Sequence, residues 1–316
     1  VESAMWSRRL QRSSLCIHAT QRYNQLRCPP AGLHLADCRC VGQPMLRKSP
    51  LTSTRASSHP ATLRAVVEDK IAIVTLLDMP GTFPWGTRIS EHRLNPQLLQ
   101  ELNAALDLAE EQGAQALVVV GEGRFFCNGM DLKYISAHSE DALSLQTEAE
   151  ATLLRILTLG MPSIAALNGH FTAAGAMLGL AFDMRIMPVD SEGLFFVPAV
   201  DIGLVYSVGM SELLKAKLPQ NMWNDAICFA RRYRCPELLQ LGVVNVAPAS
   251  SAQLLATALG HATALKMKAS DAKQRQTLHG IKRRVYKAAT QTLAQDVEDM
   301  GWTGGTWDLS GRPAKL

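Results

Sequence analysis

The sequence contains no apolar run long enough to cross a membrane. The longest candidate covers residues 171–182, well short of the roughly 20 residues that a membrane helix needs. Acidic residues are nearly absent from residues 1–64, which hold ten Arg and Lys against two acids and carry a charge of +8. Because the whole chain carries +4, the rest is mildly acidic at −4, and nothing in it predicts nucleic-acid binding.

The cysteines are odd in number and irregularly spaced, and no secretory signal accompanies them. This pattern predicts free thiols in a reducing compartment. Two of the cysteines are separated by a single residue, which is too close for a structural zinc site without a second ligand pair, so no metal site is predicted. The seven residues are Cys16, Cys28, Cys38, Cys40, Cys127, Cys228 and Cys235.

Both ends of the chain carry possible targeting signals. Residues 1–64 form a leader that is basic, rich in Ser and poor in acid, as in organellar transit peptides; the alternative is disordered or partly untranslated sequence, and neither makes the leader part of the fold. Residues 301–316 form a polar tail ending in Ala314, Lys315 and Leu316, which fits the peroxisomal small-basic-leucine signal read by an import receptor. We expect a peroxisomal protein, with the mitochondrion or plastid as alternative.

Between the leader and the tail, the pattern predicts alternating strands and helices. We expect a hairpin at 66–76, strands at 116–120, 163–167, 184–187 and 194–197, and helices at 94–112, 140–159 and from the turn at 168–170 to about 182. Residues 116–120 are continuously apolar, so both faces of that strand need covering. This predicts a layered α/β core over residues 65–235, with a helical region over residues 236–300.

Two turns that follow buried strands could carry chemistry. In residues 123–132, Gly129 permits an unusual backbone geometry just before a helix that begins at Asp131. In residues 168–177, the small residues at 173–176 let a ligand or another backbone approach the start of a helix. Each turn could serve packing alone, but the two together could supply the paired N–H donors of an oxyanion hole.

These turns carry a family resemblance. Residues 126–132 (FCNGMDL), followed by residues 162–169 (PSIAALNG), resemble the crotonase superfamily of enoyl-CoA hydratases and isomerases. Residues 91–96, 200–204 and 214–217 resemble the plant-type peroxisomal Δ3,Δ2-enoyl-CoA isomerases. The resemblance covers about residues 65–245. It implies an α/β crotonase-like spiral of ββα units with a helical C-terminal region, an acyl-CoA thioester ligand, a homotrimer or hexamer, and no cofactor beyond the coenzyme A of the substrate.

The resemblance also assigns residues. The oxyanion donors would be the backbone N–H groups of Met130 and Ala174, because charge accumulates on the thioester oxygen as the α-proton leaves. The groove for the CoA thioester would be lined by Arg93, Leu94, Cys127, Asn128, Gly129 and Asp131.

The catalytic acids depart from the family pattern. Hydratases place one glutamate where this chain has Met177, and hydratases and isomerases alike place another where it has Ala199. Hydration by the two-glutamate route is therefore not predicted. Asp201 is the tentative replacement base, although the plant isomerases carry an aspartate there beside their glutamate. Glu192 lies nearby in a loop, and we interpret His170 as a turn or groove residue.

Three functions follow as hypotheses. The first is isomerisation of 3-enoyl-CoA to 2-trans-enoyl-CoA in the β-oxidation of unsaturated fatty acids. The second is a catalytically silent homologue that binds acyl-CoA or serves as an assembly subunit, which the missing glutamates favour. The third, thioester hydrolysis, needs a positioned water and a base that the sequence does not identify.

Overall fold

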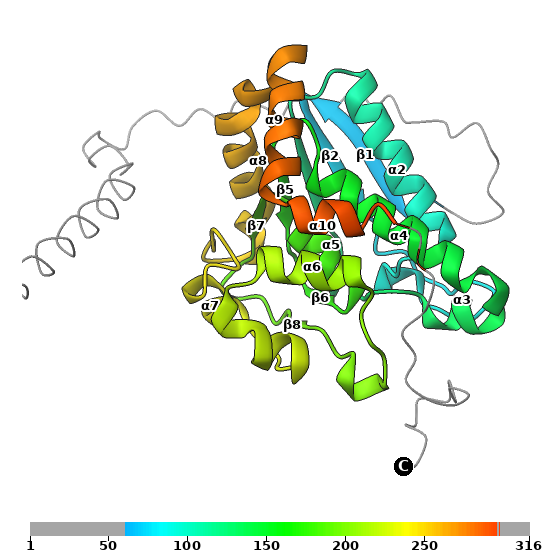
Figure 1. The fold of residues 1–316 in the computed structure, drawn as a ribbon. Coiled ribbons are helices and arrows are strands. Elements are labelled where there is room, and N and C mark those ends of the chain that lie inside the picture. The colour runs from blue at the N-terminus through cyan, green and yellow to red at the C-terminus, as the bar shows by residue number, and fades with distance from the viewer. Residues whose placement is uncertain (1–60, 296, 298–316) are drawn as a thin grey trace, which may run out of the picture. The chain divides into compact units, whose positions relative to one another are not determined.

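The computed structural model describes residues 61–295 and residue 297. The basic leader up to residue 60 and the tripeptide at 314–316 lie outside the described residues, so the targeting hypotheses stay predictions. Within the described residues, no helix is both long and apolar enough to cross a membrane. Figure 1 shows the strands running through the centre with helices around them.

The larger sheet has five strands in the order β1-β2-β3-β5-β7. β1 and β2 are antiparallel, and the other neighbours are parallel. The β1–β2 hairpin turns at Asp69 and Lys70, whose φ angles of 47° and 63° suit the two-residue turn that matches strand twist. The strands are β1 (Leu63–Glu68), β2 (Ile71–Leu76), β3 (Ala116–Gly121), β5 (Ser163–Ala166) and β7 (Met184–Ile186).

A smaller parallel sheet consists of β4 (Phe125–Cys127), β6 (His170–Thr172) and β8 (Phe195–Phe196). The chain passes from three successive parallel strands of the large sheet to the strands of the small sheet: β3 to β4, β5 to β6 and β7 to β8. Helices follow these strand pairs, so the expected spiral of ββα units is confirmed. From sequence alone, β4 and β6 are predicted to lie inside turns, because three residues are too few to show strand alternation.

Nine α-helices are described, together with short 3₁₀ and π segments. α2 begins where the sequence predicts a helix, since the Asn95 side chain accepts a hydrogen bond from the Leu98 amide at 3.0 Å and Pro96 takes the first position. The helices are α2 (Pro96–Glu111), α3 (Leu132–Ala137), α4 (Ala142–Leu157), α5 (Ala174–Ala181), α6 (Val208–Lys217), α7 (Cys235–Gln240), α8 (Leu254–Leu265), α9 (Ala272–Val285) and α10 (Lys287–Thr292).

The C-terminal region is less continuously helical than expected. No α-helix forms between α7 and α8, and Val246 pairs there with Ile186 of β7 as a parallel bridge. The chain therefore returns to the edge of the large sheet before α8 begins.

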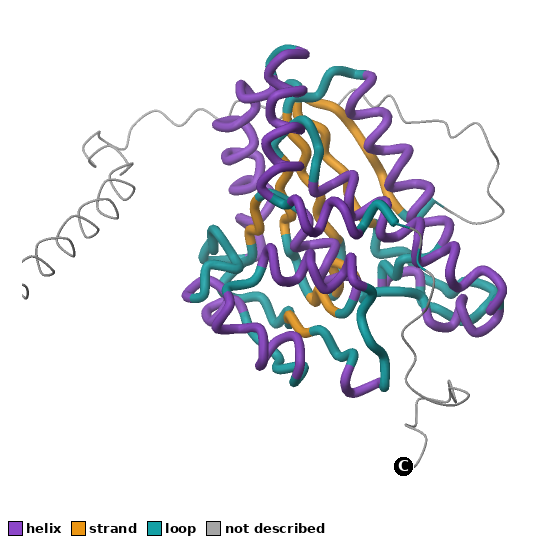
Figure 2. The backbone as a smooth tube through the Cα atoms, in the orientation of Figure 1, coloured by secondary structure: helices purple, strands orange, loops and turns teal. Residues whose placement is uncertain are grey.

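Apolar side chains of β3 alternate between two cores. Leu117 and Val119 join the main cluster with α2, α4 and α5. Val118 and Val120 join a second cluster with Ala258 of α8. Figure 2 shows the strands enclosed by helices in this way. The continuous apolar run of β3 is thus explained by helices on both faces of the sheet.

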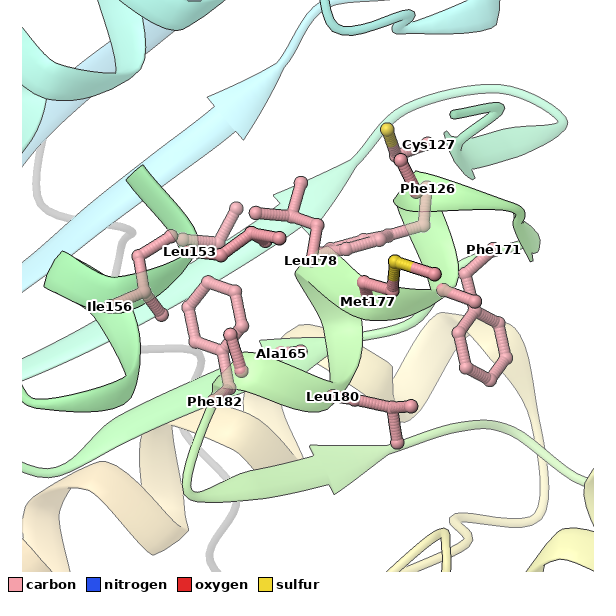
Figure 3. Packing of buried hydrophobic residues seen from close by; sticks show 14 of the residues in the cluster. Phe126, Cys127, Leu153, Ile156, Ala165, Phe171, Met177, Leu178, Leu180 and Phe182 are labelled. Carbon is pink, nitrogen blue, oxygen red and sulfur yellow. The ribbon is translucent and has the colours of Figure 1, made fainter. Parts of the chain in front are cut away.

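α5 is buried along its whole length. Figure 3 shows Met177 and Leu178 of this helix packed among Phe126, Phe171 and other apolar side chains. Because α5 starts at the turn after β6, its burial fixes the position of that turn.

Candidate active site

The two turns singled out in the sequence interlock through two glycines. A Cβ on Gly129, where φ is +82°, would lie 2.8 Å from the Cβ of Ala173 and 3.3 Å from the backbone nitrogen of Ala174. A Cβ on Gly175 would lie 2.1 Å from the carbonyl oxygen of Cys127. Each turn therefore packs its glycine against the backbone of the other. The small residues at 173–176 therefore allow a close approach by the protein backbone of the other turn.

The Met130 and Ala174 amides lie at this junction, and neither has an acceptor among residues 61–295 and 297. Leu94 donates to the carbonyl of Gly129 at 2.8 Å and accepts from the amide of Asp131 at 3.0 Å, a bridge that skips the Met130 amide. Ala174 is the first residue of α5, where an N–H has no intrahelical acceptor. Neither amide donates to another group in the part of the chain that the structure describes. Two adjacent donors of this kind can hold one anionic oxygen.

Ala173, just before α5, has a strained backbone. Its φ of 52° and ψ of −130° are rarely adopted by residues with a side chain. Its amide donates to the carbonyl of Phe196 in β8 at 2.9 Å, which helps to hold this geometry. Strain of this kind costs about 1–3 kcal/mol and clusters at ligand sites.

Arg93 braces the first turn from outside. Its Nη1 donates to the carbonyl oxygens of Asn128 and Met130, each at 3.2 Å, and its Nε donates to Glu91 at 2.6 Å. The guanidinium is therefore occupied by the turn itself, on either side of the Met130 amide.

Three other residues predicted to line the groove are buried. Asp131 caps α3 and accepts from Trp85 Nε1 at 2.8 Å and Thr87 Oγ1 at 2.5 Å. Burial raises the pKa of the Cys127 thiol to about 12, which keeps it uncharged. Leu94 is 1% exposed. These three residues shape the turn from within and have almost no exposed surface of their own.

The two glutamate positions of the family are apolar and enclosed. Met177 belongs to the main core (Figure 3). Ala199 is 5% exposed and precedes the 3₁₀ segment η3 (Val200–Ile202). Asp201, within η3, is exposed. Glu192 is exposed as well.

His170 and Tyr206 complete the surroundings. The His170 ring lies between the Leu194 amide at 3.1 Å and Arg124 Nε at 3.2 Å; burial, followed by the charge of Arg124, lowers its pKa. Tyr206, which the sequence analysis did not single out, donates its hydroxyl to the carbonyl of Val197 at 2.9 Å. Burial raises the pKa of Tyr206 to about 12, so the phenol stays neutral.

Across residues 61–295 and 297, no group of three or more His, Cys, Asp or Glu could hold a metal ion. The arrangement that remains is a pair of backbone amides at the contact of two interlocked turns, with Met177 and Ala199 at the two positions where the family carries glutamates.

Comparison with known sequences gives a consistent assignment. The profile of the enoyl-CoA hydratase/isomerase family matches residues 90–304. Enoyl-CoA delta isomerase 3 of Arabidopsis thaliana is 31% identical over 170 residues, covering 52% of this chain and 71% of the relative. A Rhodobacter capsulatus protein described as "Probable enoyl-CoA hydratase" is 30% identical over 187 residues, covering 58% of this chain and 67% of the relative.

Solved structures share the fold. An enoyl-CoA hydratase/isomerase family protein from Pseudomonas syringae superposes with a TM-score of 0.65 at 24% identity, covering 76% of this chain and 98% of that one. A Mycobacterium tuberculosis protein described as a probable enoyl-CoA hydratase gives a TM-score of 0.64 at 22% identity, covering 73% and 93%. With the family profile spanning most of the described residues, the chain belongs to the enoyl-CoA hydratase/isomerase family, the crotonases.

Proposed function

We propose that this protein is a Δ3,Δ2-enoyl-CoA isomerase, which moves a double bond of an unsaturated acyl-CoA into conjugation with the thioester. One observation carries the proposal: the Met130 and Ala174 amides lie at the contact of two interlocked turns, and no described residue accepts a hydrogen bond from either. The isomerase names of the Arabidopsis relatives support this activity over hydration. The apolar residues at Met177 and Ala199 also disfavour the two-glutamate hydration route.

The reaction needs the two amides at its central step. A base removes a proton from C2 of the 3-enoyl thioester, and negative charge moves onto the carbonyl oxygen. Donors from Met130 and Ala174 stabilise this oxygen, since preorganised N–H groups act where charge develops. Return of the proton at C4 gives the 2-enoyl thioester. The coenzyme A of the substrate supplies the thioester, and no further cofactor is required.

Asp201 is the base in this proposal. It lies two residues beyond the position of the family glutamate, on the exposed segment η3. An ionised carboxylate there can accept a proton, and a base in hydrogen-bond reach of its substrate contributes about 10²–10⁴-fold. The remaining proposed groove residues act through the shape of the turn at 127–131.

The test is turnover of the purified full chain on 3-hexenoyl-CoA, followed by the ultraviolet absorbance of the conjugated product. We expect activity, and we expect Asp201→Asn to reduce kcat by about 100-fold or more. An active Asp201→Asn variant would remove Asp201 from the mechanism. An inactive natural chain would refute the isomerase.

The second candidate is a catalytically silent acyl-CoA binder, favoured by the enclosed Ala199. In that case the natural chain binds acyl-CoA without turnover, and only the Ala199→Glu variant, which restores the family carboxylate, converts the substrate. Ala199→Gln is the matched control, because it has a similar volume but cannot accept the proton. Turnover by the natural chain would contradict this alternative.

Location and assembly extend the proposal. The peroxisomal Arabidopsis relatives and the terminal Ala314, Lys315 and Leu316 support a peroxisomal location through an import receptor. The family resemblance supports a homotrimer or hexamer. Light scattering of the purified chain measures its oligomeric state. The cellular location of a fluorescent fusion lacking the last three residues tests the C-terminal targeting signal.

A further inference from the structure

A chain of polar contacts connects the two turns that carry the amides. Glu91 Oε2 accepts from Arg93 Nε at 2.6 Å and from Asn128 Nδ2 at 3.3 Å. Asn128 Oδ1 in turn accepts from Thr172 Oγ1 at 2.8 Å. Thr172 ends β6, one residue before the strained Ala173. The contacts therefore run from residue 91, through the first turn, to the residue that leads into the second.

We propose that Glu91 is a positioning residue that sets the spacing of the Met130 and Ala174 amides, acting through Arg93 on one turn and through Asn128 and Thr172 on the other. The inference rests on the proposed function, because it assigns a task to the amides that hold the oxyanion.

Glu91 is built into the first turn by main chain as well as side chain. Its carbonyl accepts from the Asn128 amide at 3.1 Å, while its carboxylate holds the Asn128 side chain. The Arg93 guanidinium that it orients donates to the carbonyls of Asn128 and Met130. Those two carbonyls belong to the residues on either side of Gly129, so the peptide that bears the Met130 amide is clamped at both ends.

The charge of Glu91 matters to this clamp. The side chains of Glu91 and Arg93 are 23% and 26% exposed, so the pair is only partly screened by water. Burial works to raise the pKa of Glu91, but the hydrogen bond and charge of Arg93, followed by Asn128, outweigh it and lower the pKa. The carboxylate stays ionised, and charge-assisted hydrogen bonds are roughly twice as strong as neutral ones.

Thr172 completes the link by joining the first turn to β6. Its hydroxyl donates to Asn128, and the residue is 4% exposed. This bond adds to the pairing of β4 with β6 and to the two glycine contacts that already join the turns. The link therefore limits sliding of one turn along the other.

The experiment compares two ligands on the full chain. A 3-oxoacyl-CoA ionises to an enolate, whose oxygen needs both amides, whereas a saturated acyl-CoA of equal length stays neutral. The variants are Glu91→Gln, which removes the charge and keeps the volume, and Thr172→Val, which removes the hydroxyl. Glu212→Gln, at an ion pair with Lys215 far along the chain, is the control. Thermal unfolding shows that each variant is folded.

We expect Glu91→Gln and Thr172→Val each to weaken enolate binding by about tenfold or more, the loss typical of a misplaced oxyanion donor. Binding of the saturated thioester should change by less than about twofold, because it draws little on the amides. Equal losses for both ligands, or none, would overturn the positioning role. If the unaltered chain binds neither thioester, the proposed function fails first, and this inference fails with it.

Discussion

Replacing Gly175 with alanine tests the contact on which the site depends. Gly175 is the second residue of α5, and its Cα faces the backbone of Cys127 in the neighbouring turn. An added Cβ would lie 2.1 Å from the carbonyl oxygen and 2.6 Å from the carbonyl carbon of Cys127, whereas ordinary contacts begin at 3.4 Å. The turns must therefore move apart by about 1.3 Å, since neither partner is a flexible side chain.

The displacement has two consequences of different size. Overpacking of this kind costs about 1–3 kcal/mol of unfolding free energy. A shift of about 1 Å also carries one amide out of hydrogen-bond range of an oxygen held by the other, and losing one oxyanion donor costs about 10²–10³ in kcat. Gly175→Ala should therefore raise the activation free energy, by about 2.7–4 kcal/mol, more than it lowers the free energy of unfolding.

The matched control is another glycine in a helix. Gly260 of α8 has nothing within 4 Å of an added Cβ, so Gly260→Ala should gain about 0.5–1 kcal/mol of stability and keep full activity. Turnover of 3-hexenoyl-CoA and urea unfolding of both variants give the comparison, with enolate affinity as the readout if the chain is silent. A Gly175→Ala variant with unchanged turnover or enolate affinity would refute the interlocked-turn account of the site.

Two further predictions concern stability. Ala173→Gly relieves the strain of the positive φ but also makes the unfolded chain more flexible, so its net effect should be to raise the free energy of unfolding by about 1 kcal/mol. Ala176→Gly, inside α5, should lower the free energy of unfolding by about as much. Urea unfolding measures both changes. Burial, reinforced by the charge of Arg185, lowers the pKa of Lys217 from 10.5 to about 7. Unfolding therefore takes up a proton between these values, and stability should rise with pH by about 1.4 kcal/mol per unit from this group. Lys217→Met should flatten the rise measured between about pH 7.5 and 9.5, whereas the exposed Lys215→Met should keep it.

The sequence predicts the elements that need only local information. The apolar run of β3 requires cover on both faces, and the Asn95-Pro96 pair marks the start of α2. Gly129 and Asp131 mark a turn and a helix start, both confirmed by the positive φ and the capping bond. These features depend on neighbours within a few positions, which is the range that periodicity and capping rules cover.

The features that could not be predicted from the sequence depend on contacts between residues far apart in the chain. β4 and β6 are strands because they pair with each other across more than 40 positions. Nothing local to Gly175 shows that its neighbour is the backbone of Cys127. Glu91 was noticed only within a family-like run, and its bond to Asn128 spans 37 positions. The targeting signals lie outside the described residues and stay predictions.

The placement of α8 has a consequence for synthesis of the chain. The strands that α8 covers are complete by residue 186, and Ala258 belongs to the cluster on their second face. At about 5–20 residues per second, the ribosome needs several seconds more to synthesise α8. During that interval one face of the completed sheet exposes apolar side chains to solvent, which makes the nascent chain prone to aggregation. A nascent chain arrested before residue 254 should therefore bind a chaperone that recognises exposed apolar segments, and one extended past residue 265 and clear of the exit tunnel should release it.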